Sequence, residues 1–234
     1  MKIAYVEWAS LIDFPGRVAA VIWTVGCNLR CPFCYNGELV LPERTVDLPP
    51  VDPEMVLSEL ASRRGFLDGL AVTGGEPTLQ GGLADFLAEV KALGLKVKLD
   101  TNGTRPEVLA TLLERGLVDY VALDLKAPFP RYPEFTGVRE DVSGRVKQSV
   151  RILREWAPDY ELRTTVVPGL SQADLEAIAQ EARGAKRYVL QPFFVPQGKE
   201  LIDPSWAGRP HLEEEALRRL APRLSRFLPC SVRA

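Results

Sequence analysis

Short apolar runs alternate with longer amphipathic runs along most of the chain. The short runs are rich in Val, Ile, Leu and Ala, and such continuous runs are typical of parallel strands that are covered on both faces. They predict six strands, at residues 19–24, 70–73, 96–100, 120–124, 161–167 and 187–191. The longer runs predict helices, at residues 82–93, 106–115, 141–156 and 172–182, with another that begins after Asp52. This alternation predicts an α/β fold with a parallel sheet and right-handed crossovers.

The alternation of strand-like and helix-like runs stops after Phe193. The stretch VPQGKELIDPSWAGRP shows neither the apolar run of a strand nor the spacing of a helix. One further helix is expected over residues 212–227. A chain of 234 residues does not require two domains. We therefore interpret residues 1–234 as a single domain, with a core over about 12–192 and a C-terminal extension over 193–234 that lies on the sheet.

Composition and charge exclude several classes of protein. The formal net charge of −2 gives no basic field for nucleic acid. The most apolar stretch, VAAVIWTV, is too short to span a bilayer, and Glu7 and Asp13 interrupt any signal peptide. We expect a cytoplasmic protein that binds neither nucleic acid nor membrane. Clustered cysteines in the cytoplasm more often hold metal or carry redox chemistry than form disulfides.

Three cysteines lie together in GCNLRCPFCYNG, namely Cys27, Cys31 and Cys34, with CxxxCxxC spacing. Three thiolates in one tight loop suit an iron–sulfur cluster that keeps one iron open. Structural zinc normally takes four protein ligands, and the spare soft ligands, Cys230 and His211, both lie in the C-terminal extension. The spacing favours a cluster, and a zinc-stapled binding module without catalysis is the alternative from another class.

Polar residues follow the predicted strands at their carboxyl ends, where parallel α/β folds gather their ligands. Asp124 and Lys126 alternate, so their side chains share one face of the chain. The polar groups at the strand ends are TGGEPT (residues 73–78), DTNG (100–103), DLK (124–126), Arg163 and Gln191. The sequence thus predicts one site at this edge of the sheet.

Together these motifs resemble the radical S-adenosylmethionine (SAM) superfamily. The resemblance is carried by the cysteine spacing, by Phe33 before the last cysteine, and by GGEP at residues 74–77. It implies a partial (β/α)6 TIM-type barrel in which Cys27, Cys31 and Cys34 hold a catalytic [4Fe-4S] cluster. SAM would chelate the open iron, and one electron would cleave it to a 5′-deoxyadenosyl radical that abstracts hydrogen.

A narrower resemblance is to the activating enzymes of glycyl-radical enzymes. It is carried by DFPGR (13–17), CYNG, DTNG, DLK and VVPG (166–169), and covers roughly residues 12–191. Within that group the chain is most similar to the anaerobic ribonucleoside-triphosphate reductase activating proteins. The resemblance implies a glycyl-radical enzyme as the substrate. Residues 39–71 contain no cysteine for a second cluster, so reduced flavodoxin or ferredoxin is the expected electron donor.

The resemblance also implies roles for single residues. Phe33 resembles the aromatic residue whose backbone contacts adenine, and Asn36 matches an asparagine near SAM. The methionine amino group is expected on the GGE stretch, at Gly74, Gly75 and Glu76.

Further contacts with SAM are implied at the later strand ends. Asp100 and Asn102 resemble ribose or carboxylate-side contacts, and Lys126 and Arg163 resemble basic groups near the SAM carboxylate or ribose. Gln191 stands where related activases often carry a histidine. Asp100 and Asp124 lie on adjacent strands, where two negative charges are expected to be stabilised by a cation between them. In the activases a monovalent metal ion can take this role.

A second enzymatic interpretation is a 7-carboxy-7-deazaguanine synthase or another small radical SAM enzyme. That synthase family usually has Cys-Asp-Thr after the cluster loop and a Glu-Thr-Asn-Gly stretch. This chain has CYNG and DTNG instead, which favours the activase.

Overall fold

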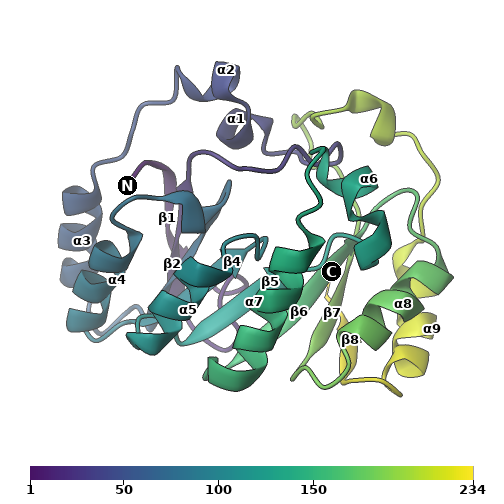
Figure 1. Cartoon of the computed structure of the whole chain (residues 1–234). Coiled ribbons are helices and arrows are strands. Elements are labelled where there is room, and N and C mark those ends of the chain that lie inside the picture. The colour runs from purple at the N-terminus through teal and green to yellow at the C-terminus, as the bar shows by residue number, and fades with distance from the viewer. Residues whose placement is uncertain (234) are drawn as a thin grey trace.

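The computed structural model describes residues 1–233, which form one eight-stranded sheet in chain order. Strands β2 to β8 run parallel, whereas β1 pairs antiparallel with β2. Over the described residues the sheet stays open, with β1 and β8 at its two ends (Figure 1). The strands are β1 (Ile3–Ser10), β2 (Ala19–Thr24), β3 (Gly69–Gly74), β4 (Lys96–Thr101), β5 (Tyr120–Asp124), β6 (Tyr160–Val166), β7 (Tyr188–Pro192) and β8 (Cys230–Val232).

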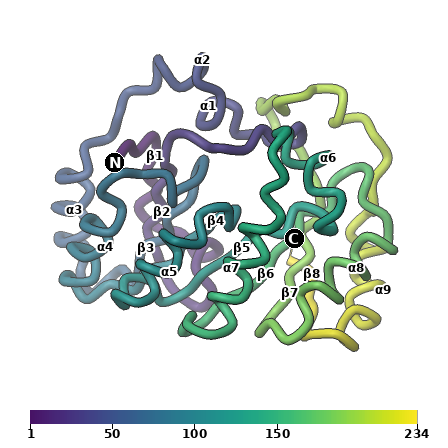
Figure 2. Tube along the Cα trace, viewed as in Figure 1, coloured from purple at the N-terminus to yellow at the C-terminus, as the bar shows by residue number. Residues whose placement is uncertain are grey.

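Helices connect the parallel strands. Figure 1 shows α3 and α4 near one end of the sheet and α8 and α9 near the other, with α5 and α7 between them. Figure 2 traces the same path from the N-terminus beside β1 to the yellow segment that holds α9 and β8. The helices are α1 (Gly37–Val40), α2 (Pro42–Thr45), α3 (Pro53–Ser62), α4 (Leu83–Ala92), α5 (Pro106–Glu114), α6 (Tyr132–Thr136), α7 (Ser143–Trp156), α8 (Gln172–Glu181) and α9 (Glu214–Leu224).

The structure confirms the predicted α/β class and the open, mostly parallel sheet. Each of the six predicted strands corresponds to one of β2 to β7, and α9 lies within the helix expected over 212–227. Local signals explain the helix starts: Asp52 accepts a hydrogen bond from the Glu54 N–H, and Ser171 forms a capping box with Asp174. The division into a core and an extension stays a prediction.

Two strands were missed. Strand β1 is an antiparallel edge strand that leaves Tyr5 and Glu7 exposed, so it lacks the continuous apolar character of the others. Strand β8 has only three residues and pairs with β7. Its existence depends on a neighbour far away in sequence, which the local pattern of CSV does not reveal.

The face of the sheet that carries Asp124 holds a small apolar cluster near its amino end and the polar strand ends at its carboxyl end. Phe14, from the DFPGR stretch, packs with Ala19, Tyr120 and Ala122 in a small separate cluster, with 6.0 Å between the Phe14 and Tyr120 ring centroids. Side chains two residues apart share a face, so Asp124 lies on the same side as Tyr120 and Ala122. This apolar cluster forms a floor beneath the polar strand ends.

Candidate active site

A cavity of about 860 Å³ opens at the carboxyl ends of the parallel strands. Its wall includes every site residue that the sequence predicted. These residues are Cys27, Cys31, Phe33, Cys34, Asn36, Gly74, Gly75, Glu76, Asp100, Asn102, Lys126, Arg163 and Gln191. The structure therefore brings all of them together at one place, although their individual roles stay predictions.

The cysteine loop follows β2 directly and packs against the GGEP turn after β3. The Glu76 N–H donates to the Gly26 carbonyl at 2.7 Å, and a Cβ on Gly75 would lie 2.1 Å from that same oxygen. Gly74 has a φ of 121°, which an L side chain rarely adopts, and its Cβ would meet the backbone of Thr24. The two glycines are thus required for the cysteine loop and the GGEP turn to touch.

Burial raises the pKa of all three thiols. The value rises to about 11 for Cys27 and about 12 for Cys31, and it also rises for Cys34. Buried thiols of this kind are protonated at neutral pH and lose the proton when they bind metal. Metal binding at these thiols would therefore release protons.

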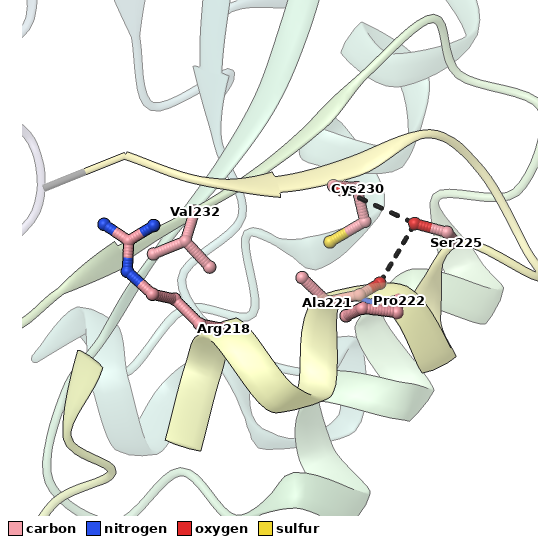
Figure 3. A pocket seen from close by; sticks show the side chains of 6 residues that line it. All are labelled: Arg218, Ala221, Pro222, Ser225, Cys230 and Val232. Carbon is pink, nitrogen blue, oxygen red and sulfur yellow. Dashed lines mark hydrogen bonds between the residues drawn. The ribbon is translucent and has the colours of Figure 1, made fainter. Parts of the chain in front are cut away.

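The donor set fits a cluster better than a single ion. No group of three or more His, Cys, Asp or Glu side chains among residues 1–233 is gathered tightly enough to hold one metal ion. A cubane cluster, in contrast, spreads its thiolates over different irons. The fourth cysteine, Cys230, instead lines a separate pocket between α9 and β8 with Arg218 and Ser225 (Figure 3).

Glu76 is only 1% exposed and links the end of β3 to the end of β4. Its carboxylate accepts hydrogen bonds from Thr78, from the Thr101 hydroxyl at 2.7 Å and from the Asn102 N–H at 2.7 Å. Burial raises its pKa, and these donors oppose the rise. Glu76 was predicted to contact an amino group. In the structure its carboxylate also fixes the position of the DTNG turn.

A network of charged side chains spans β4, β5 and β6. The Arg163 guanidinium lies between two carboxylates: its Nε is 2.9 Å from Asp124 Oδ1, and its Nη1 is 3.2 Å from Asp100 Oδ2. Lys126 Nζ lies 2.9 Å from Asp124 Oδ2, and Lys98 pairs with Asp100. Strand register explains the meeting, because Asp124 lies opposite Arg163 in the β5–β6 ladder.

A cation was expected between Asp100 and Asp124. The structure places the Arg163 guanidinium of the chain itself at this position. Burial opposes ionisation of Asp124, but Arg163 and Lys126 outweigh it and lower the pKa to about 2. The pKa of Asp100 is lowered against burial by Arg163 and Lys98. Both carboxylates are thus ionised and neutralised before any ligand binds.

Beneath the network lies a second ion pair that the sequence did not reveal. The side chain of Glu161 has no exposed surface, and it accepts two hydrogen bonds of 2.6 Å from Arg233 and one of 2.7 Å from the Tyr120 hydroxyl. Burial opposes ionisation of Glu161, but Arg233 and Tyr120 keep its pKa lowered. Arg233 also lines the cavity, so the residue that directly follows β8 contributes to this site.

Residues 194–209, which we call the strap, cross the outside of the cysteine loop. The Ile202 N–H donates to the Cys34 carbonyl and the Asp203 N–H to the Pro32 carbonyl, both at 2.9 Å. Trp206 is buried between Phe33 and Phe135, with ring-centroid distances of 5.8 and 5.9 Å. The strap therefore holds the backbone of the loop that carries the predicted cluster ligands.

Comparison with known proteins agrees with this architecture. Residues 21–182 match the radical SAM superfamily, and the chain belongs to this family, which uses SAM and a [4Fe-4S] cluster.

Among residues 1–233, no helix combines the length and the apolar character that a membrane crossing requires.

Among related sequences, the chain is 33% identical over 226 residues to the “Putative glycyl-radical enzyme activating enzyme MJ1227” of Methanocaldococcus jannaschii, which covers 94% of this chain and 90% of that one. It is also 29% identical over 198 residues to a 7-carboxy-7-deazaguanine synthase of Methanopyrus kandleri, covering 74% of this chain and 77% of that protein. The family is thus shared with enzymes of more than one activity.

Solved structures share the fold at low sequence identity. Streptococcus suis SuiB bound to its precursor peptide SuiA superposes with a TM-score of 0.69 at 16% identity, covering 92% of this chain and 48% of SuiB. The anSMEcpe structure with bound AdoMet gives a TM-score of 0.64 at 18% identity, covering 87% of this chain and 58% of that one. The chain spans about half the length of these two structures, and the likeness concerns the fold alone.

Proposed function

We propose that this protein is a glycyl-radical-enzyme activating enzyme, which cleaves SAM reductively and abstracts hydrogen from a glycine of its partner. The observation that carries the proposal is the 33% identity to the Methanocaldococcus jannaschii protein, which extends over 94% of this chain and 90% of that one. The motifs DFPGR, CYNG and DTNG support the activase class, and the resemblance of the chain, in length and wording, to the anaerobic ribonucleoside-triphosphate reductase activating proteins makes that reductase the proposed partner. Reduced flavodoxin or ferredoxin is the proposed electron donor.

Cys27, Cys31 and Cys34 would hold the cluster, with the fourth iron left for SAM. When bound, the cluster supplies the single electron that splits SAM into methionine and a 5′-deoxyadenosyl radical, which takes up a hydrogen atom. The chain's own contribution at this point is to exclude water, since Cys31 is 7% and Phe33 8% exposed. A dry site also strengthens every electrostatic contact made inside it.

The charge network suits the carboxylate of SAM. Lys98, Lys126 and Arg163 face only two carboxylates, Asp100 and Asp124, so the group keeps one positive charge. Lys126 is the best candidate for the contact, because Asp124 holds its ammonium group in the cavity at 2.9 Å. The ion pairs that position Lys126 and Arg163 exist before binding, which reduces the entropy lost on binding.

The remaining predicted contacts are proposed on the same cavity wall. We assign the backbone of Phe33 to adenine, the GGE stretch to the methionine amino group, and Asp100 to a ribose or carboxylate-side contact, with Asn36 near SAM and Gln191 in place of the histidine of related activases. A monovalent ion near Asp100 would have to share the carboxylates with Arg163. SAM cleavage that is unchanged after removal of Na⁺ and K⁺ would count against such an ion.

The direct test mixes the reconstituted protein with purified anaerobic ribonucleoside-triphosphate reductase, SAM and a reductant under strict anaerobic conditions. We expect a glycyl-radical signal in the electron paramagnetic resonance (EPR) spectrum of the reductase. A reductase whose radical-site glycine is changed to alanine provides the control and should give no signal.

Failure with the reductase would leave the second candidate, which the similarity to 7-carboxy-7-deazaguanine synthases favours. That activity predicts turnover of 6-carboxy-tetrahydropterin by the reconstituted protein. Turnover of the pterin together with a silent reductase would replace the activase proposal by this one.

A further inference from the structure

The three thiols of the cysteine loop lie in unequal surroundings. Cys27 Sγ accepts the N–H of Leu29 at 3.4 Å and the side-chain amide of Asn102 at 3.8 Å. Burial raises the pKa of Cys34, and the nearby backbone N–H of Asn36 opposes that rise. Cys31 is the most buried of the three, and burial and nearby charges, with no hydrogen bond from the described residues among the causes, set the shift of its pKa. The Asn102 contact stands apart because its donor comes from the end of β4, outside the loop.

The orientation of the Asn102 amide follows from its partners. Its Oδ1 accepts the backbone N–H of Thr104 at 3.0 Å and the Thr104 hydroxyl at 2.6 Å. A backbone N–H can only donate, so this side of the amide must be the oxygen. The NH₂ side therefore faces Asn28 Oδ1, at 3.1 Å, and Cys27 Sγ.

Other contacts fix the same amide in place. The Asn102 backbone N–H donates to the buried Glu76, and Asn28 Nδ2 donates to the Thr104 hydroxyl at 2.8 Å. Asn102 is 7% exposed. An asparagine so fully engaged has little freedom to follow a ribose, which is the role that the family resemblance suggested for it.

We propose that Asn102 is a positioning residue for the cluster, whose amide N–H donates to the Cys27 thiolate and eases reduction. Reduction adds negative charge to a cluster and its thiolates, and an N–H dipole aimed at sulfur stabilises that charge. The inference depends on the proposed cluster at Cys27, Cys31 and Cys34. It assigns to Asn102 an effect on reduction potential in place of substrate contact.

The test is a redox titration of the reconstituted cluster, followed by EPR in the absence of SAM. Asn102→Ala removes the donor, and Asn102→Asp keeps an oxygen for Thr104 while it places a carboxylate near the thiolate. We expect Asn102→Ala to lower the equilibrium constant for reduction about tenfold, which is ~59 mV for a one-electron couple. Asn102→Asp should lower it further.

The matched control is Thr104→Val, which disturbs the same hydrogen-bond network but touches no thiol. Its potential should stay close to that of the wild type. Equal potentials in the wild type and both Asn102 variants would overturn the proposal, as would an equal shift in Thr104→Val. If neither Asn102 variant takes up iron while Thr104→Val does, Asn102 is a scaffold residue and the proposal is also overturned.

The wild-type protein separates this inference from the proposed function. A wild type that takes up iron and sulfide and forms 5′-deoxyadenosine, with an unchanged potential in the Asn102 variants, contradicts only the inference. A wild type that forms no cluster contradicts the proposed function itself.

Discussion

The cysteine loop and the charge network line the same cavity but reach it in different ways. The network of Asp100, Asp124 and Arg163 stands on three regular strands, and opposite charges within the chain neutralise its carboxylates. The cysteine loop is irregular, and burial raises the pKa of its thiols. The charges of the network are balanced by partners within the chain, whereas the thiols of the loop must lose protons to bind a metal group. Changes in the two should therefore affect different properties.

The largest effect is expected from removal of a cluster ligand. Cys31→Ala should abolish cluster binding, with a loss of SAM cleavage greater than the roughly 10–100-fold typical of groups that only support a ligand. The iron content and the absorbance of the reconstituted protein measure the loss. The urea midpoint of the metal-free variant should stay close to that of metal-free wild type, because the network does not depend on the loop.

A matched control for this change is Cys230→Ala, since Cys230 lies in the separate pocket between α9 and β8 (Figure 3). It should keep its full iron content. Loss of the cluster in Cys230→Ala would show that the assignment of three ligands is wrong.

Removal of the central guanidinium should act on stability. Arg163→Met leaves Asp100 and Asp124 facing each other without their shared partner, and breaking a buried ion pair in this way costs roughly 3–5 kcal/mol of the free energy of unfolding. Urea denaturation at neutral pH measures it. Arg187→Met, which breaks the more exposed pair with Asp159, should cost only about 0–1 kcal/mol. Similar losses of unfolding free energy in Arg163→Met and Arg187→Met would show that the buried network contributes no more to stability than an exposed ion pair.

The strap offers a way to loosen the loop without touching a ligand. Trp206→Ala removes the side chain between Phe33 and Phe135 and should destabilise the protein by about 3 kcal/mol. It should also speed the transfer of iron from the reconstituted cluster to a chelator several-fold, since the strap holds the carbonyls of Pro32 and Cys34.

Trp156→Ala is the matched control for the strap, because Trp156 is 51% exposed. It should leave iron release unchanged. Equal rates in wild type and Trp206→Ala would indicate that the strap covers the loop without fastening it.

The smallest effect is the pH dependence of the network. The pKa of Asp124 is lowered to about 2 in the folded protein, below the value near 4 of an unfolded chain. Its contribution, about 2 kcal/mol, is fully present above roughly pH 4 and is lost as the pH falls towards 2.

Asp124→Asn should remove this contribution at pH 7 and flatten the loss of stability between pH 4 and 2. Urea denaturation across this range measures the change, with Asp47→Asn in an exposed loop as the control. If the acid slopes of Asp124→Asn and wild type coincide, the low pKa of Asp124 is wrong.

The sequence predicted the strand ends because local patterns carry that information. CxxxCxxC, GGEP and DLK each sit within a few residues, and their places after strands fixed the edge at which they meet. The glycines of GGEP were expected to admit a ligand, whereas the structure shows that Gly75 also admits the Gly26 carbonyl. That contact depends on packing between two loops, which no local pattern records.

Most of the missed residues have partners far away in sequence, and Lys98 is the exception. Glu161 meets Arg233 across 72 positions and Tyr120 across 41, and Lys98 enters the cavity because it alternates with Asp100 on β4. Alternation along β4 was a usable signal for Lys98. The Glu161–Arg233 pair needed the β7–β8 pairing, and the burial of Trp206 needed the path of the strap.

The central claim is that the cysteine loop carries a cluster that cleaves SAM. The most direct measurement reconstitutes the full chain anaerobically with iron and sulfide, reduces it with dithionite, adds SAM and quantifies 5′-deoxyadenosine. We predict product from the wild type and none from Cys31→Ala. A colourless protein that holds stoichiometric zinc and forms no product would contradict the claim and favour a zinc-stapled binding module.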